Sequence, residues 1–271
     1  MVSKRTFQFS VAALLFATAL IGVFVASVLA ISESIAFRRR AAVVDEIGER
    51  GGVLARFNEK ERVLVSDSID SECANVVILK GLSGEEFRHN WASLFPKLER
   101  LALMDSDLRD HDFRNFSDLS HLCEISLAGS KLPASGSEHI GKVAGLKNLD
   151  LTATNTSDRD IEKISGLNEL KVLKLAGTNV SDEVFKTIRN FQKLEVLDVS
   201  FCKISDVGIL NLSGHQRLSR LKVEHTNVTN RAILDLGKTC DKLLYLDFDN
   251  LKEETGIAPR SLGKEDGNDM N

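Results

Sequence analysis

Histidines, cysteines and carboxylates are the side chains of this chain that could catalyse a reaction or bind a metal. The six histidines share no common spacing and stand at positions 89, 111, 121, 139, 215 and 225. The sequence has neither a phosphate-binding G-x-x-x-x-G-K-[ST] loop nor the G-x-S-x-G, H-E-x-x-H or G-x-G-x-x-G patterns of hydrolases, metalloproteases and dinucleotide-binding enzymes. The sequence therefore predicts no catalytic residue, no cofactor and no small-molecule substrate.

Four cysteines are scattered along the chain at Cys73, Cys123, Cys202 and Cys240. None forms a C-x-x-C pair, so we expect no zinc site and no other metal site. We interpret all four as small buried hydrophobic residues.

The charge of the chain argues against nucleic acid as a partner. The chain has 35 basic and 39 acidic residues, a net charge of −4. Residues 1–40 hold five of the basic residues and one acidic residue, which leaves 30 and 38 for residues 41–271, a net charge of −8. Because nucleic-acid binding is driven by basic surface, no such binding is expected.

A repeat of 24 residues must position any functional site. Its pattern, L-x-x-L-x-L/V, starts at Leu146, Leu170, Leu194 and Leu218, and weaker copies give about eight units within residues 63–250. A fixed period of this size indicates a solenoid. The second and third apolar positions are two residues apart, so both should point into the core. The residue between them should then lie on the opposite, open face of a sheet.

Each strand is followed by a turn and then by a helical pattern. The turn begins with a short polar residue that can bond the turn backbone, and these residues are Thr154, Thr178, Cys202 and Thr226. A Ser/Thr–Asp/Asn pair then predicts a capped helix of about two to three turns, because a hydroxyl caps a helix start and an acid suits its dipole. One repeat has Pro133 and Ala134 instead, so we expect a looser turn and a later helix over residues 138–143.

These repeats resemble the leucine-rich repeat family. The short stem before them is similar to that of bacterial membrane-anchored members. The resemblance implies an α/β solenoid, a right-handed curved stack of short parallel strands backed by helices. The family usually has asparagine where this chain has Thr or Cys, so the chain looks like a subtype. Such frameworks serve mostly as binding surfaces, and the resemblance therefore implies a non-enzymatic protein-interaction module with no particular partner.

The open face of the C-terminal repeats is the candidate contact surface. Its charges alternate along the sheet, which is typical either of a self-neutralising ladder or of a charged strip that a partner protein contacts. Aromatic residues and arginine dominate interface energetics, and several flank this strip. The predicted partner-binding residues are Asp150, Val172, Lys174, Val196, Asp198, Phe201, Arg220, Lys222, His225, Tyr245 and Asp247.

The N-terminal part predicts a membrane anchor. Residues 1–10 are short and basic, and the apolar run 11–31 is long enough to cross a bilayer as a single transmembrane helix. A cleaved signal peptide, which would leave a secreted domain, is the alternative. The apolar core of a signal peptide usually has ~7–15 residues, so the length favours an uncleaved signal anchor. Basic residues lie on both sides of the run, and we expect the repeats on the non-cytoplasmic side.

The segments that flank the repeats are predicted to be short. Residues 32–62 should form a juxtamembrane stem and an N-terminal cap for the first repeat, with short strands at 53–54 and 62–65. Residues 251–271 are rich in charged residues and glycine, which predicts a disordered tail.

The sequence as a whole favours a membrane-tethered repeat domain that binds another protein. A structural envelope component without a discrete ligand is one alternative. Another is an adaptor or effector similar to the substrate-binding subunits of ubiquitin ligases. That alternative requires an F-box-like helical segment before the repeats, and residues 32–72 are too short and too polar to supply one.

Overall fold

The computed structural model describes residues 53–58, 63–65, 76–80, 95–113 and 116–247, all within one compact unit that spans residues 47–271. The predicted transmembrane segment 11–31, the tail 251–271 and Cys73 lie outside these residues. Within the described ranges, no helix is both long and apolar enough to cross a bilayer.

A ten-stranded sheet runs through this unit in the order β10-β9-β8-β7-β6-β5-β4-β3-β1-β2. From β3 to β10 each strand is parallel to its neighbours, whereas β1 is antiparallel to both β2 and β3. β1 therefore occupies the sheet edge that the first repeat would otherwise expose. The strands are β1 (Val53–Asn58), β2 (Val63–Val65), β3 (Val76–Lys80), β4 (Arg100–Met104), β5 (Glu124–Ser126), β6 (Asn148–Asp150), β7 (Val172–Lys174), β8 (Val196–Asp198), β9 (Arg220–Lys222) and β10 (Tyr245–Asp247).

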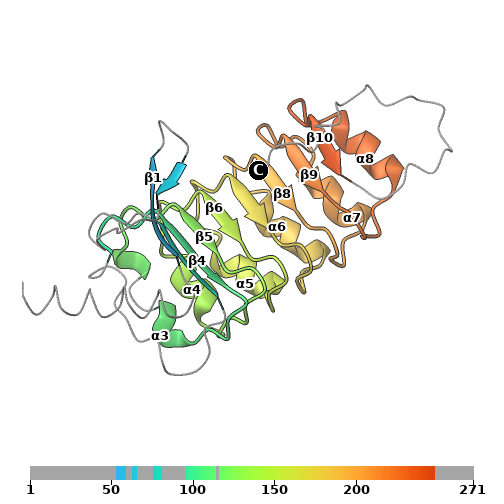
Figure 1. Cartoon of the computed structure of the whole chain (residues 1–271). Coiled ribbons are helices and arrows are strands. Elements are labelled where there is room, and N and C mark those ends of the chain that lie inside the picture. The colour runs from blue at the N-terminus through green and yellow to red at the C-terminus, as the bar shows by residue number, and fades with distance from the viewer. Residues whose placement is uncertain (1–52, 59–62, 66–75, 81–94, 114–115, 248–271) are drawn as a thin grey trace, which may run out of the picture. The chain divides into compact units, whose positions relative to one another are not determined.

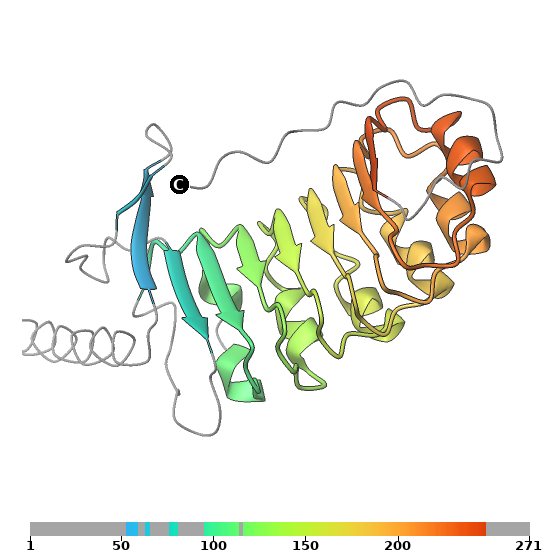
Figure 2. The ribbon, with the colours of Figure 1, turned by 45° about the vertical axis from the view of Figure 1, so that its right-hand side comes forward.

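Short helices follow the strands and lie along one side of the sheet (Figures 1 and 2). The α-helices are α3 (Asp110–Phe113), α4 (Gly136–Ile140), α5 (Asp158–Lys163), α6 (Phe185–Ile188), α7 (Asp206–Ile209) and α8 (Asn230–Gly237), and the 3-10 turns are η1 (Phe116–Asp118), η2 (Asp182–Val184) and η3 (Leu210–Leu212). Helix α8, with eight residues, has the predicted two turns, whereas the other α-helices have four to six residues and are shorter than predicted. A strand, two turns and the helix must all fit within one repeat, which shortens the helix.

Equivalent residues of neighbouring repeats meet in the core. Leu149 is in register with Leu173, Leu173 with Leu197, and Leu197 with Leu221. All four are at most 1% exposed. The third apolar position of these repeats is buried as well, at Leu151, Leu175, Val199 and Val223. The predicted inward-facing positions are therefore confirmed, and each repeat buries its apolar side against its neighbours.

The short polar residue after each strand bonds backbone, as predicted. The Oγ1 atoms of Thr154, Thr178 and Thr226 donate to the carbonyl three residues earlier, over 2.7, 2.6 and 2.7 Å. The Sγ of Cys202 lies 3.0 Å from the carbonyl oxygen of Leu175 in the preceding repeat. These bonds hold each turn against the core without asparagine.

An aspartate ladder joins the helix starts of neighbouring repeats. The sequence suggested that these aspartates complement the helix dipole, but each carboxylate also accepts hydrogen bonds from the next repeat's cap residue. Asp158 accepts from the backbone N–H of Ser181 at 2.9 Å and from its Oγ at 2.7 Å. The steps of the ladder are Asp158 to Ser181, Asp182 to Ser205, and Asp206 to Thr229. Each of these Ser/Thr hydroxyls also accepts an N–H of its own helix, which confirms the predicted caps.

The repeat with Pro133 and Ala134 has a different connection to its neighbour. Its helix α4 starts two residues later, relative to its strand, than α5 does. The start is late as predicted, although the helix covers Gly136–Ile140 instead of residues 138–143. The Asn155 side chain joins the two repeats here, because its Oδ1 accepts from Leu132 N–H at 2.8 Å and its Nδ2 donates to the Leu132 carbonyl at 3.0 Å.

The cysteines differ in their exposure. Cys202 and Cys240 are buried, as predicted, but Cys123 is only partly buried. The prediction was wrong for Cys123 because this residue precedes β5 at the repeat position of Lys171 and Glu195, which faces water.

The aspartate ladder should contribute measurably to stability. We expect Asp182→Ala to lower the free energy of unfolding by about 1–3 kcal/mol, because the backbone N–H and hydroxyl of Ser205 lose a charged acceptor. Gly208 lies so close that a Cβ there would be 2.2 Å from Asp182 Oδ1, which shows how tightly this carboxylate is enclosed. Denaturant unfolding of the purified chain would measure the loss. The control is Glu183→Ala at the adjacent exposed acid, where we expect a change within about 0.5 kcal/mol, and equal losses in both variants would contradict the ladder's role.

Candidate binding surface

The predicted charged residues occupy one row of register positions across five neighbouring strands. The strand register places Asp150 beside Lys174, Lys174 beside Asp198, and Asp198 beside Lys222. It also places Asp247 beside Lys222. This charged row (Asp150, Lys174, Asp198, Lys222 and Asp247) therefore brings together residues that are almost a hundred positions apart in sequence.

Backbone and side-chain bonds hold much of the charged row in place. The Lys174 Nζ lies 3.1 Å from Asp150 Oδ2, so the expected attraction between strands is confirmed at this pair. Asp150 and Asp198 each also accept the backbone N–H two residues further on, both at 3.0 Å. The two carboxylates thus present a fixed edge to solvent, and less side-chain freedom would be lost on binding.

An apolar centre lies next to the charged row. Val172 and Val196 are neighbours in register, and both are half-buried on the open face. On the side away from the charged row, Lys171 and Glu195 form an ion pair with 3.1 Å between Nζ and Oε1. The exposed Arg220 continues the valine row on β9. Apolar side chains bounded by charged pairs resemble the core and rim of a protein interface. The Lys171–Glu195 pair was not predicted, although its 24-residue spacing was a signal for it.

Phe201 and His225 stack on one another where β8 and β9 end. Their ring centroids are 4.4 Å apart with 33° between the ring planes, and Phe201 is 58% exposed. Both have left-handed backbone, with φ of 58° for Phe201 and 52° for His225. Left-handed backbone is strained for a bulky residue, and an exposed phenylalanine there gains little from burial.

The strain at Phe201 is a property of the repeat. Earlier repeats also have positive φ at this position, which holds Asp105, Gly129, Ala153 and Gly177. The turn after each strand therefore imposes left-handed backbone, and most of the earlier residues there are small. The glycines at 129 and 177 were the available sequence signal, and the sequence reasoning placed Phe201 and His225 at the strand ends without recognising it. Strain retained at an exposed aromatic residue points to a use in recognition.

The last two predicted residues belong to β10. Tyr245 is in register with Arg220, and Asp247 with Lys222. The backbone of β10 therefore extends both rows by one strand. All eleven predicted residues lie on neighbouring strands β6 to β10 or on the turns that follow them.

Groups with a shifted pKa lie elsewhere and do not form a common site. Burial raises the pKa of Asp112 in α3 and of the Cys123 thiol, and burial lowers the pKa of His215 after η3. These residues belong to three different repeats.

In the part of the chain that the structure describes, no group of three or more His, Cys, Asp or Glu side chains is placed to hold a metal ion. The arrangement on the open face is suited to contact, since it offers apolar area, an aromatic ring and paired charges.

Comparison with known proteins gives the following similarities. A family model described as "Leucine Rich repeat" matches residues 192–216. An internalin C2 from Listeria monocytogenes strain 4b F2365 is 20% identical, with a TM-score of 0.48 over 69% of this chain and 85% of that chain. An internalin F from the same strain is 16% identical, with a TM-score of 0.43 over 63% of this chain and 59% of that chain. No curated protein matches the chain.

Both TM-scores lie below 0.5, so the assignment of the family rests on the chain's own repeat. The matched residues span one period, which contains β8, the cap residue Ser205, α7 and η3. The same order of strand, polar turn and short helix recurs in the neighbouring repeats, with the strands in parallel register. Residues 192–216 thus form a leucine-rich repeat, and the same arrangement of strand, turn and helix recurs in the neighbouring repeats of this chain.

Proposed function

We propose that the open face of the C-terminal repeats binds another protein and that the chain catalyses no reaction. The observation that carries this proposal is Phe201, a large aromatic side chain that is 58% exposed on left-handed backbone. Folding gives this ring a stack on His225 but leaves most of the ring exposed, whereas an aromatic residue covered by a partner can contribute several kcal/mol to binding.

The surroundings of Phe201 support this function. The half-buried Val172 and Val196 provide apolar area on the same face, and the exposed Arg220 adds a residue type that is enriched in interface hot spots. Charged side chains of both signs border this area, so a partner would need a matching pattern of charge as well as an apolar patch. Because the parallel register holds these side chains on one sheet, the surface exists before the partner arrives.

The contact can be tested without knowing the partner in advance. We expect the triple variant Lys174→Ala, Phe201→Ala, Arg220→Ala to lose a partner that the wild-type chain enriches from solubilised membranes, measured by quantitative mass spectrometry. Once the partner is purified, its affinity for the variant should be lower by at least about 2 kcal/mol, roughly thirtyfold in Kd, because hot-spot residues carry most of the binding energy.

A matched variant on the helix side provides the control. Lys186→Ala, Arg231→Ala, Leu234→Ala also removes one lysine, one arginine and one large apolar side chain, all exposed. This control should retain the partner. If both triple variants retain it, or both lose it, the open face is not the contact surface. If the wild-type chain enriches no heterologous protein, a structural role is favoured.

A substitution at Phe201 should affect partner binding without lowering the stability of the fold. We expect Phe201→Asn to leave the free energy of unfolding unchanged or to raise it by up to about 1 kcal/mol, since asparagine tolerates left-handed backbone better than phenylalanine does. The same variant should weaken partner binding, because the exposed ring is lost. Thermal unfolding and binding measured on one preparation would check both effects. A variant that unfolds more easily yet binds normally would assign Phe201 a purely structural role.

We also propose that residues 11–31 tether the repeats to a membrane, on the non-cytoplasmic side. The support is the length and apolarity of this segment in the sequence. A reporter enzyme that is active only outside the cytoplasm, fused after Asn271, should therefore be active, and the full-length chain should stay in the membrane fraction. A reporter that works only in the cytoplasm, fused at the same point, should be inactive. The opposite pattern would reverse the orientation, and a shortened soluble chain would indicate signal-peptide cleavage.

A further inference from the structure

His215 occupies a buried column that is otherwise filled by apolar residues and a cysteine. In the other repeats where the structure describes this position, the equivalent residues lie in the core: Phe95, Leu119, Val143, Leu167, Phe191 and, after the one-residue insertion, Cys240. His215 is 7% exposed. An ionisable ring at this position is therefore enclosed between apolar neighbours of the two adjacent repeats.

Both ring nitrogens of His215 are occupied. The Nε2 atom lies 3.1 Å from the carbonyl oxygen of Phe191, and the backbone N–H of Leu218 donates to Nδ1 over 3.3 Å. These bonds require a neutral ring with its hydrogen on Nε2. A second proton would go to Nδ1 and would turn the acceptor of the Leu218 N–H into a donor that faces another donor. The charged ring cannot keep both bonds.

The direction of the pKa shift agrees with this geometry. Burial lowers the pKa of His215, and the bond to the Phe191 carbonyl opposes the shift in part. The folded repeat thus binds this proton more weakly than the unfolded chain does. The stability that depends on the neutral ring is present above the unfolded pKa of about 6.5 and is lost as the pH falls below it.

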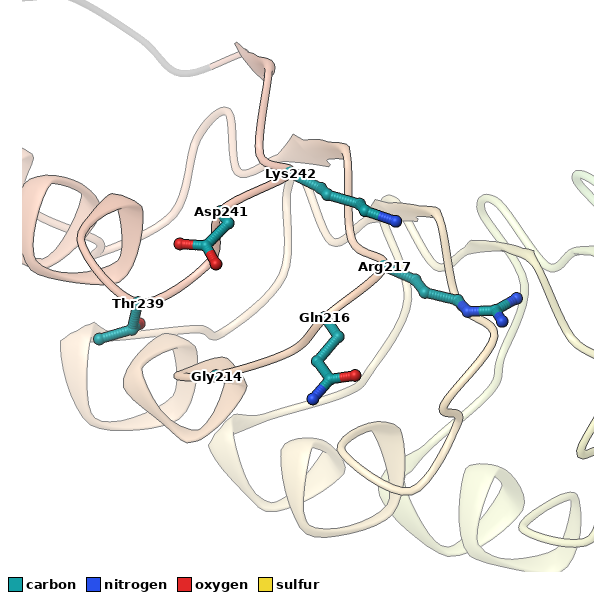
Figure 3. A pocket seen from close by; sticks show the side chains of 6 residues that line it. All are labelled: Gly214, Gln216, Arg217, Thr239, Asp241 and Lys242. Carbon is teal, nitrogen blue, oxygen red and sulfur yellow. The ribbon is translucent and has the colours of Figure 1, made fainter.

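The loop that carries His215 borders a polar hollow open to solvent. Figure 3 shows the side chains around this hollow, which is lined by Gly214, Gln216, Arg217, Thr239, Asp241 and Lys242. Gly214 has left-handed backbone with φ of 80°. Arg217 and Lys242 extend to one side of the hollow, and Asp241 points the other way (Figure 3). A ring displaced from the column could therefore reach water.

Charged groups near His215 do not favour a charged ring in the column. Arg217 and Lys242 on the flanking loops are cationic, and Asp241 is the acidic residue of the hollow. On the preceding repeat, Lys193 is paired with Glu169 at 2.6 Å. The buried neighbour in the column is Cys240, whose Sγ lies 3.3 Å from the carbonyl oxygen of Leu212. Among the residues that the structure describes, no carboxylate contacts the ring to compensate a second proton.

We propose that His215 is an acid-sensitive latch: protonation at Nδ1 releases the backbone N–H of Leu218 and loosens the repeat that starts there. The proton comes from solvent, and no covalent bond changes. The loosened repeat contains β9, which carries Arg220 and Lys222 of the candidate binding surface. A fall in pH would therefore also weaken partner binding, and this second consequence rests on the proposed function.

Hydrogen exchange on the intact chain tests the latch without a partner. After correction for the intrinsic pH dependence of exchange, protection of amides in residues 218–223 should fall as the pH drops below about 6.5 and should level off only once the pH reaches the lowered pKa of the folded His215. Protection in residues 149–151 should change much less, since no buried histidine lies in that repeat. His215→Phe, which places the residue type of the preceding repeat in the column, should abolish the dependence between pH 7 and pH 5. His215→Leu provides the same test with a smaller side chain.

His121→Gln is the control, because it removes an exposed histidine from an equivalent loop and should retain the wild-type pH dependence. Unchanged protection of residues 218–223 in the wild-type chain between pH 7 and pH 5 would overturn the proposal. Wild-type pH dependence in His215→Phe or His215→Leu would overturn it as well. If the exchange results hold but partner binding does not weaken at pH 5, the latch stands and the proposed binding surface is the part that fails.

Discussion

Lateral fit between neighbouring repeats is the constraint on which this structure depends. Leu149, Leu173, Leu197 and Leu221 are register partners on successive strands and are almost completely buried. A single repeat offers its apolar side to water, so the apolar area becomes stabilising only when the next repeat covers it. The spacing must be kept because a strand shifted by one residue would turn its buried face outward.

The polar bonds of the fold follow the same spacing. The aspartate ladder bonds the backbone N–H of each cap residue, the turn hydroxyls bond the carbonyl three residues earlier, and each ladder step reaches one repeat onward. Where Pro133 and Ala134 interrupt the ladder, Asn155 bonds the backbone of Leu132 in its place. The repeats are thus connected by specific hydrogen bonds as well as by apolar contact, and the irregular repeat can be accommodated.

Departures from the repeat occur at the positions that we propose for recognition and regulation. Phe201 places a large ring where earlier repeats mostly have Gly, Ala or Asp on left-handed backbone. His215 places an ionisable ring where the other repeats have a buried apolar residue or cysteine. Each of these residues differs from the residue type that its repeat position favours, a small residue on left-handed backbone or an apolar residue in the core. Such conflicts are expected at functional sites. The two positions lie in one strand–helix unit, Phe201 after β8 and His215 after η3, so loosening of the repeat next to His215 would also affect the contact surface.

The sequence by itself determined the repeat, the inward-facing positions, the helix caps and the rows of the open face. Periodicity carries this information, because a strand exposes alternate residues and equivalent positions of a stack must meet. Only the tertiary structure decided the short helices, the ladder from Asp182 to Ser205, the stacking of Phe201 on His225 and the two bonds of the His215 ring. These features depend on distances between atoms of different repeats and on backbone angles. A spacing of 24 residues brings two side chains to the same row, but the packing of the surrounding atoms sets which of them touch.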